Sequence, residues 1–180
     1  MAEQNNKPIT NEALVEAIKE MRENFTAETQ NKVINVALRS TFLVPAIVQK
    51  NTELVADADN HVKFQDKQTA KFVLINHKER GSFFPVFTDR DEIEKLRGKT
   101  DEEFRPFAMK FADIAGLTEN TKQVQGFVVN PFNQNLPFTQ EMLASIKQTL
   151  IRVKQERDAA KKAEAEAAAP DITVSTNEEN

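Results

Sequence analysis

The chain has 180 residues, of which 24 are Lys or Arg and 28 are Asp or Glu, giving a formal net charge of -4 at pH 7. It contains no cysteine, which excludes disulfides, thiolate metal sites, thiol nucleophiles and persulfide carriers. The negative net charge disfavours a polyanionic partner such as nucleic acid.

Two helices are predicted at the N-terminal end. Apolar residues at helical spacing mark residues 11–24, with Thr10 or Asn11 as the N-cap, and residues 27–38. Because the apolar stripe of each helix needs a partner, we expect the two to form a hairpin.

The middle of the chain predicts strands. A continuous apolar run at residues 41–48 is typical of a buried strand interrupted by its proline, and residues 51–60 are polar and turn-like. Residues 62–64 alternate as a half-exposed strand would. Residues 70–75 and 83–87 flank a glycine-containing polar stretch and predict a hairpin with a longer loop.

The second half predicts three helices and one strand. Residues 88–91 are typical of an N-cap followed by acids and lead into a short helix. Apolar residues at steps of three and four predict a second helix over residues 104–115, ended by the glycine that follows. A strand at residues 126–129 stops before Pro131, and Thr139 is the predicted N-cap of a final long helix.

These elements indicate an α+β fold: a mixed sheet of about five strands with helices packed on it, an N-terminal helical hairpin and a charged C-terminal helical extension. We expect residues 1–9 to be a flexible N-terminus and residues 10–155 to be one α+β domain. Residues 156–180 predict a charged Ala/Glu/Lys tail, first a frayed helix and then disordered. Lys147, Lys154 and Lys161 recur at heptad spacing on the last helix, as a solvated charged face would show.

Three apolar motifs in order resemble one known family. They are Phe42-Leu43-Val44-Pro45, Phe84-Pro85-Val86-Phe87-Thr88 and Val128-Val129-Asn130-Pro131-Phe132. The order is similar to that of the N-terminal domain of the SseB family, the enhanced serine sensitivity proteins, over about residues 42–146. The resemblance implies an α+β fold and supplies no catalytic residue. A rhodanese-like activity does not fit this chain, because it requires a cysteine persulfide.

One candidate site is predicted where strand ends and loops share an edge of the fold. The residues expected to converge there, as a shallow peptide-binding surface, are Glu79, Arg80, Thr88, Asp89, Asn130 and Phe132. The alternative is that Asn130 and Thr88 hydrogen-bond within their own turns while Phe132 packs in the core.

No catalytic residue, cofactor or metal is predicted. The four glycines are too scattered for a phosphate-binding loop. The segment Asp57-Ala58-Asp59-Asn60-His61 lacks the downstream glycine and glutamate of a calcium loop.

We therefore expect a non-catalytic protein-interaction or regulatory module with an unidentified protein partner; homo-oligomerisation is left open. The residues at the start of the chain lack a signal-peptide pattern and the apolar runs are too short to span a bilayer, so we expect a cytoplasmic location and no membrane. The alternative is a small-molecule sensor or an enzyme with a site near Arg80 and Asn130, acting through His77, Glu79 or Arg80. A third alternative is an RNA-binding module that stacks bases on Phe127 and Phe132.

Overall fold

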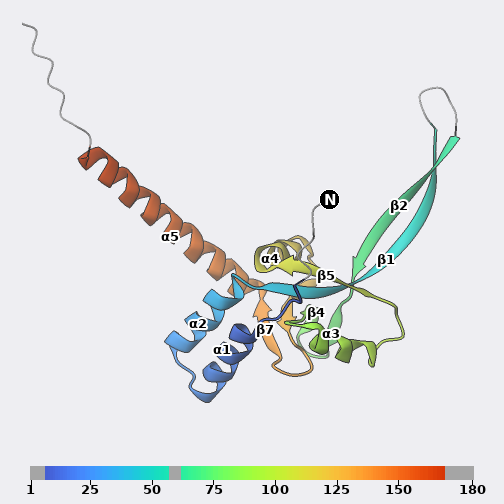
Figure 1. Cartoon of the computed structure of the whole chain (residues 1–180), viewed down its shortest axis with the longest axis horizontal. Coiled ribbons are helices and arrows are strands. Elements are labelled where there is room, and N and C mark those ends of the chain that lie inside the picture. Colours follow the sequence, from blue (N-terminus) through green and yellow to red (C-terminus); the bar gives the residue numbers. More distant parts are fainter. Residues whose placement is uncertain (1–6, 57–61, 169–180) are drawn as a thin grey trace, which may run out of the picture. The chain divides into compact units, whose positions relative to one another are not determined.

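A computed structural model of the chain describes residues 7–56 and 62–168, and within these it describes residues 51–56 and 62–68 by their backbone alone. The helices are α1 (Glu12–Glu23), α2 (Ala27–Ala37), α3 (Arg90–Arg97), α4 (Phe111–Asn120) and α5 (Gln140–Ala167). The strands are β1 (Thr41–Ala56), β2 (Val62–Phe72), β3 (Ile75–His77), β4 (Gly81–Val86), β5 (Arg105–Lys110), β6 (Val124–Val129) and β7 (Leu136–Thr139). The predicted α+β class is confirmed (Figure 1).

The predicted N-terminal hairpin of helices is present, and the residue that precedes its first helix also bonds to the strands. α1 buries Leu14 and Ile18 completely, while α2 begins at a capping box between Thr26 and Thr29. Asn11 stands at the N-cap of α1 but does not cap it. Its side-chain amide instead donates to the backbone oxygens of Thr41 (2.9 Å) and Thr88 (2.7 Å), which ties α1 to the strands.

The strands divide between two sheets instead of the single mixed sheet of about five strands that we predicted. One sheet is antiparallel, in the order β2-β1-β5, and the other has the order β3-β4-β6-β7. In the second sheet β4 pairs β6 in parallel and the other pairs are antiparallel. Leu43 and Phe87 exchange backbone hydrogen bonds of 2.9 Å and so join the two sheets.

β1 is much longer than predicted. Its first half pairs β5, and its second half pairs only β2 among the described strands, so the two strands continue as the long arm seen in Figure 1. Residues 51–56, predicted as a turn, belong to this arm, because they pair residues 62–67 in a continuous antiparallel ladder. The rest of the predicted turn, residues 57–60, lies outside the described residues.

The predicted helix over residues 104–115 is wrong in its first half. Residues 105–110 form β5 against β1, with Phe107 opposite Val44 and Pro106 opposite Pro45. Helical spacing of apolar residues was overridden here by tertiary strand pairing. α4 starts only at Phe111, and Gly116, the predicted end, lies inside it.

Two other boundaries moved. Residues 70–72 belong to β2 in the first sheet, so the predicted hairpin is formed by β3 and β4 around a short turn at residues 78–80. Leu136–Thr139 is strand β7 paired with β6, and α5 follows it directly. The backbone bonds of an apolar segment beside a sheet edge are satisfied by adding a strand.

Phenylalanines contribute to two apolar clusters. Phe111, Phe127 and Phe138 meet with ring centroids 5.0 to 5.4 Å apart. The second cluster contains Phe87, Ile93, Leu96 and Phe104, with Phe132 packed against it. Buried aromatic pairs of this geometry add to the free energy of burial.

α5 belongs to a second compact unit. The first unit ends at Gln140 and the second begins at Glu141. α5 runs without interruption to Ala167, through the predicted boundary at residue 155, and buries none of its side chains. The predicted disordered segment, residues 170–180, lies outside the described residues. Within residues 7–56 and 62–168, no helix combines the length and the apolar character that a bilayer span requires.

Candidate functional site

A buried hydrogen-bond network joins the end of β4 to the loop after β6. The backbone N–H of Thr88 donates to Asn130 Oδ1 at 3.0 Å, and Asn130 Nδ2 donates to Thr88 Oγ1 at 2.8 Å. Asn130 Nδ2 also donates to Gln134 Oε1 at 2.6 Å. Asn130 and Thr88 are both 0 % exposed, and a polar group left unpaired at such a depth is costly. The network therefore holds the loop after β6 against the chain leaving β4.

The loop after β6 is shaped by two asparagines in the left-handed region. Asn130 has φ 47° and Asn135 has φ 46°, a conformation that asparagine tolerates better than most residues. The backbone oxygen of Asn130 accepts from the N–H groups of Asn133 (3.0 Å) and Asn135 (2.8 Å). This tight turn presents Pro131 and Phe132 beside the sheet.

α3 is anchored to the same network. Asp89 is its N-cap: Oδ1 accepts from the Glu92 N–H at 3.0 Å and Oδ2 accepts from the Thr88 hydroxyl at 2.7 Å. Glu92 Oε1 accepts from Lys95 Nζ (2.6 Å) and Asn133 Nδ2 (2.9 Å), while Glu92 Oε2 is buried with no hydrogen-bond partner among the described residues. The cap, the helix and the loop therefore hold one another in place.

A groove of about 300 Å³ lies beside this supported loop; we name it the sheet-face groove. It is lined by Ile75, Asn76, His77, Arg80, Phe83, Val128, Pro131, Phe132, Asn135 and Pro137. Its apolar members come from four strands and the loop, and its polar members are exposed at the rim. A largely apolar hollow with a few polar groups around it is the common form of a binding site.

Strand alternation explains why the groove forms here. Successive side chains of a strand point to opposite faces, and Phe127, next to Val128, packs against Phe111 of α4. Val128 therefore faces away from α4, and the register places Pro137 directly opposite it on β7. Val128 and Pro137 therefore form part of the lining on this face.

Two of the predicted site residues line the groove. Arg80 stands in the exposed turn between β3 and β4, and Phe132 is half-buried, stacked on Phe87 with centroids 6.4 Å apart and with Lys99 Nζ 5.1 Å from its ring centre. Glu79, in the same turn as Arg80, does not line it; its N–H donates to His77 Nδ1 at 3.2 Å.

Of the other three predicted residues, Thr88 and Asn130 are buried and Asp89 is half-buried. Thr88, Asp89 and Asn130 are brought together as expected, but as a structural network. The alternative, in which Thr88 and Asn130 bond within their own turns while Phe132 packs in the core, agrees with the bonds to Asp89 and Gln134 and with the packing of Phe132. Thr88 and Asn130 also bond to each other across 42 residues, which the alternative did not include. The Asn130 amide is engaged inside the fold through its oxygen and its nitrogen, and a contact of Asn130 with a partner stays a prediction.

The RNA-binding alternative loses one of its two stacking residues. Phe127 is 0 % exposed between the rings of Phe111 and Phe138, so it cannot present a face to a base. His61, considered as part of a calcium loop, lies outside the described residues. Within the described ranges, no group of three or more His, Asp or Glu side chains is arranged to hold a metal ion.

The sequence did not indicate the floor of the groove. Phe83 and Val128 were assigned only to strands, because continuous apolar strands do not show which face is covered, and Pro137 was not assigned to a strand at all. Asn135 was also missed, although an asparagine five residues after Asn130 and next to a strand is a turn signal.

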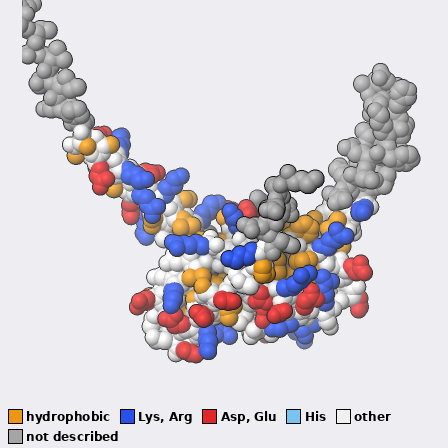
Figure 2. All heavy atoms as spheres, viewed as in Figure 1, with side chains coloured by type: hydrophobic (Ala, Val, Ile, Leu, Met, Phe, Trp, Pro, Cys, Tyr) orange, Lys and Arg blue, Asp and Glu red, His pale blue; other side chains and the backbone are white. Residues whose placement is uncertain are grey.

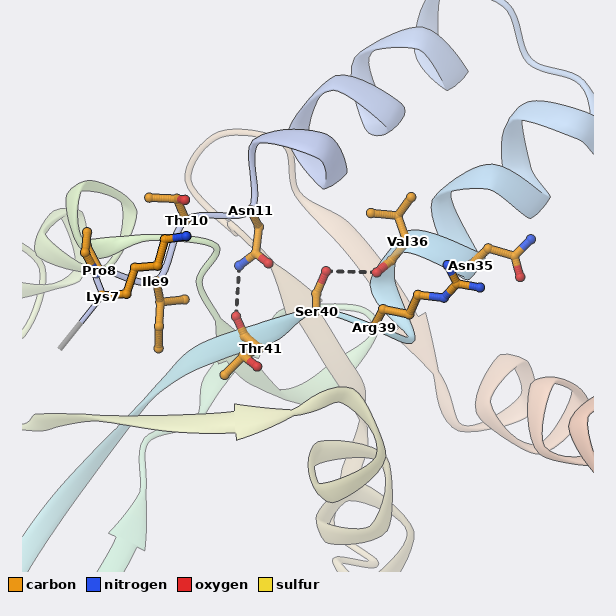
Figure 3. Close-up of a pocket in the computed structure, with 10 residues that line it drawn as sticks. All are labelled: Lys7, Pro8, Ile9, Thr10, Asn11, Asn35, Val36, Arg39, Ser40 and Thr41. Carbon is orange, nitrogen blue, oxygen red and sulfur yellow. Dashed lines mark hydrogen bonds between the residues drawn. The ribbon is translucent and has the colours of Figure 1, made fainter. Parts of the chain in front are cut away.

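A second hollow of about 580 Å³ lies between the N-terminal segment and the end of α2. Figure 3 shows Lys7, Pro8, Ile9 and Thr10 on one side of it and Asn35, Val36 and Arg39 on the other. Its inner polar side chains are engaged by the fold: Asn11 donates to Thr41 O and Ser40 Oγ donates to Val36 O (2.9 Å). We favour the sheet-face groove, although it is smaller, because its polar rim surrounds an apolar floor.

Residues 14–145 match the family described as SseB protein N-terminal domain. The chain belongs to this family. The match spans both sheets, the buried network and every residue of the sheet-face groove, and it ends within the first turns of α5. No curated protein and no solved structure matches the chain significantly.

Proposed function

We propose that this SseB-family chain is a non-catalytic protein-interaction module that binds a segment of another protein in the sheet-face groove. The observation that carries the proposal is the composition of the groove: an apolar floor of Phe83, Val128 and Pro137 with cationic and amide groups at its rim. An apolar centre with a polar rim is the usual anatomy of a protein interface.

The chemistry of the rim indicates what the bound segment carries. Arg80 is exposed, and a guanidinium group can donate two parallel hydrogen bonds to one carboxylate. His77 lies on the adjacent edge strand β3 and Asn135 at the end of the supported loop. A segment that places one apolar side chain on the floor and a carboxylate against Arg80 fits both features.

The supporting network favours binding over chemistry at this site. Thr88, Asp89 and Asn130 are satisfied by one another, so they act by holding Pro131 and Phe132 in place. A rim that is already ordered loses little conformational entropy when a ligand binds. Our proposal includes a cytoplasmic location, which the absence of cysteine supports.

The test uses peptides selected on the wild-type chain by display and measured by fluorescence anisotropy. Arg80→Glu should weaken binding about 10- to 100-fold, because it removes a charged hydrogen bond of about 1.5–3 kcal/mol and adds repulsion. Lys78→Glu is the matched control, since it makes the same charge change in the same turn outside the groove, and it should change binding less than about twofold.

Equal losses in the two variants would mean that only net charge matters, and the groove would not be the binding site. Nuclear magnetic resonance gives a second check, because a bound peptide changes the chemical shifts of the protein amides that it contacts. Shift changes that lie outside β3, β6 and the loop after β6 would contradict the proposal in the same way.

A small-molecule sensor is the second candidate, favoured by the groove volume of about 300 Å³, which is at the lower end of the range for small-molecule sites. Thermal-shift screening against metabolites with carboxylate groups separates the two. A ligand at 100 times its dissociation constant adds about 2.7 kcal/mol to the free energy of unfolding, and Arg80→Glu should abolish that gain.

A further inference from the structure

The long arm formed by β1 and β2 has an edge with no strand beside it among the described residues. β5 pairs with β1 only as far as Ala46, and beyond that point β1 pairs only with β2, on its other side. Ile47 packs against the core cluster that contains Phe87, so the free edge begins at Val48. A two-stranded ribbon is marginally stable by itself in water. A helix cannot satisfy such an edge, because its own backbone groups already bond to one another; only another extended segment can.

The two strands of the arm differ in how they treat their outer edges. β2 carries Lys63, Lys67 and Lys71, one at every fourth position, and lysine on an edge strand disfavours the addition of another strand. Residues 48–54 of β1 contain one basic residue, one acidic residue and no proline. Figure 2 shows hydrophobic side chains at the surface where the described part of the arm joins the rest of the fold. The edge of β1 is therefore the one suited to pairing.

This edge is complementary to itself in one register. When two copies pair antiparallel about a twofold axis at Asn51, apolar residues face apolar residues, polar residues face polar residues, and no like charges are opposed. Axes at Lys50 or at Glu53 would place identical charges opposite each other. The facing pairs in the Asn51 register are Val48 with Leu54, Gln49 with Glu53, and Lys50 with Thr52, the second residue of each pair belonging to the second copy.

The pairing inside each copy extends the match across four strands. β1 and β2 pair so that Val48 lies opposite Ala70 and Leu54 lies opposite Phe64. Two joined arms would have the strand order β2-β1-β1-β2. Ala70 and Val48 of one copy would continue in one row with Leu54 and Phe64 of the other, and the twofold axis repeats that row. Facing apolar residues of this kind stabilise a sheet, and four strands hold together better than two.

We propose that the arm joins two copies of this chain, through antiparallel pairing of residues 48–54 of β1 with the same residues of a second copy. The paired segment is about 23 Å long. It contains no residue of the sheet-face groove, so the dimer is a property beyond the proposed binding function, and either proposal stands if the other fails. Each dimer presents two grooves.

Cross-linking of the full chain tests the register directly. The chain has no cysteine, so an introduced cysteine is its only thiol. Asn51→Cys should give a disulfide-linked dimer under mild oxidation, because facing Cα atoms lie about 4.5–5.5 Å apart. Gln49→Cys is the matched control: its counterpart lies four positions further along the strands, about 13 Å away, which is too far for a disulfide. Electrophoresis without a reducing agent measures both.

Substitutions at Thr52 separate dimerisation from folding. Thr52 lies opposite Asp66 in its own chain and opposite Lys50 of the second copy in the proposed register. Thr52→Lys should therefore favour the arm of a single chain but weaken the dimer, and Thr52→Glu should do the reverse. Analytical ultracentrifugation should show the wild-type chain dimerising in the micromolar range. The dissociation constants of the two variants should shift by about 2- to 30-fold in opposite directions, since two symmetry-related pairs change at once.

Two further variants complete the test. Val48→Asp with Leu54→Asp should abolish the dimer, and Arg80→Glu, in the groove, should leave it unchanged; circular dichroism reports whether each variant is folded. The proposal is overturned by a wild-type chain that stays monomeric at every concentration, by equal cross-linking at positions 49 and 51, or by a dimer that both Thr52 variants weaken equally. A dimer that is lost when residues 169–180 are deleted would also overturn it, because the edge of β1 would then not be what joins the copies.

Discussion

Asn130→Ala is the substitution that most directly tests the buried network. It removes the acceptor of the Thr88 N–H, which is then buried and unpaired at a cost of about 1–3 kcal/mol. It also puts alanine at φ 47°, which adds about 1–2 kcal/mol of backbone strain. The substitution also removes the hydrogen bond to Gln134, but Gln134 is only partly buried and can bond to water instead, so this loss adds little. Together these effects predict that the free energy of unfolding falls by about 2–5 kcal/mol, a large part of the roughly 5–15 kcal/mol of a typical domain.

Urea denaturation followed by circular dichroism measures that loss. Asn130→Gly is the matched variant, because glycine adopts the left-handed region without strain but offers no amide. It should recover about 1 kcal/mol relative to alanine and still lie below the wild type. If both variants unfolded within about 0.5 kcal/mol of the wild type, the amide would contribute nothing beyond an ordinary surface group, and the network would not be what holds the loop.

Substitutions at three further positions test other parts of the fold. Asp89→Ala removes the N-cap of α3 and should lower the free energy of unfolding by about 0.5–2 kcal/mol, while Asp89→Asn, which keeps the acceptor, should recover most of it; chemical denaturation measures both. Gly126→Ala should destabilise the chain by at least about 1–3 kcal/mol, because its new Cβ would lie 2.1 Å from the backbone oxygen of Phe138. Gly116→Ala, inside α4 with nothing within 4 Å of the new Cβ, should instead stabilise it by about 0.5–1 kcal/mol. A thermal melt of the two glycine variants that moved in the same direction would contradict this distinction.

Local sequence signals predicted the elements that depend on local interactions. The helical hairpin, the short helix capped at Asp89 and the β3–β4 hairpin were found from caps, spacing and turn residues, all of which act within a few residues of the chain. The family resemblance carried by the motifs around Pro45, Thr88 and Asn130 is confirmed by the family match.

Long-range pairing accounts for what the sequence did not reveal. Phe104, Phe107 and Phe111 are spaced as in a helix, yet residues 105–110 pair with residues 41–46 of β1, far earlier in the chain. Asn130 and Thr88 were singled out correctly as polar residues near strand ends. Their mutual bonds span 42 residues, and no local pattern distinguishes a side chain that faces a ligand from one that faces another loop.

The buried network and the groove rim affect binding by different routes, and this separates their roles. Arg80 would touch the bound segment, so Arg80→Glu changes the intrinsic dissociation constant. Asn130 lies behind the rim, so its loss lowers the fraction of molecules whose loop is correctly placed, and the apparent dissociation constant rises by the inverse of that fraction. A saturating ligand then restores much of the stability that Asn130→Ala removes, because ligand binding selects the ordered loop. The same ligand concentration should stabilise the Arg80→Glu variant much less, because its loop is ordered but the contact with the ligand is missing.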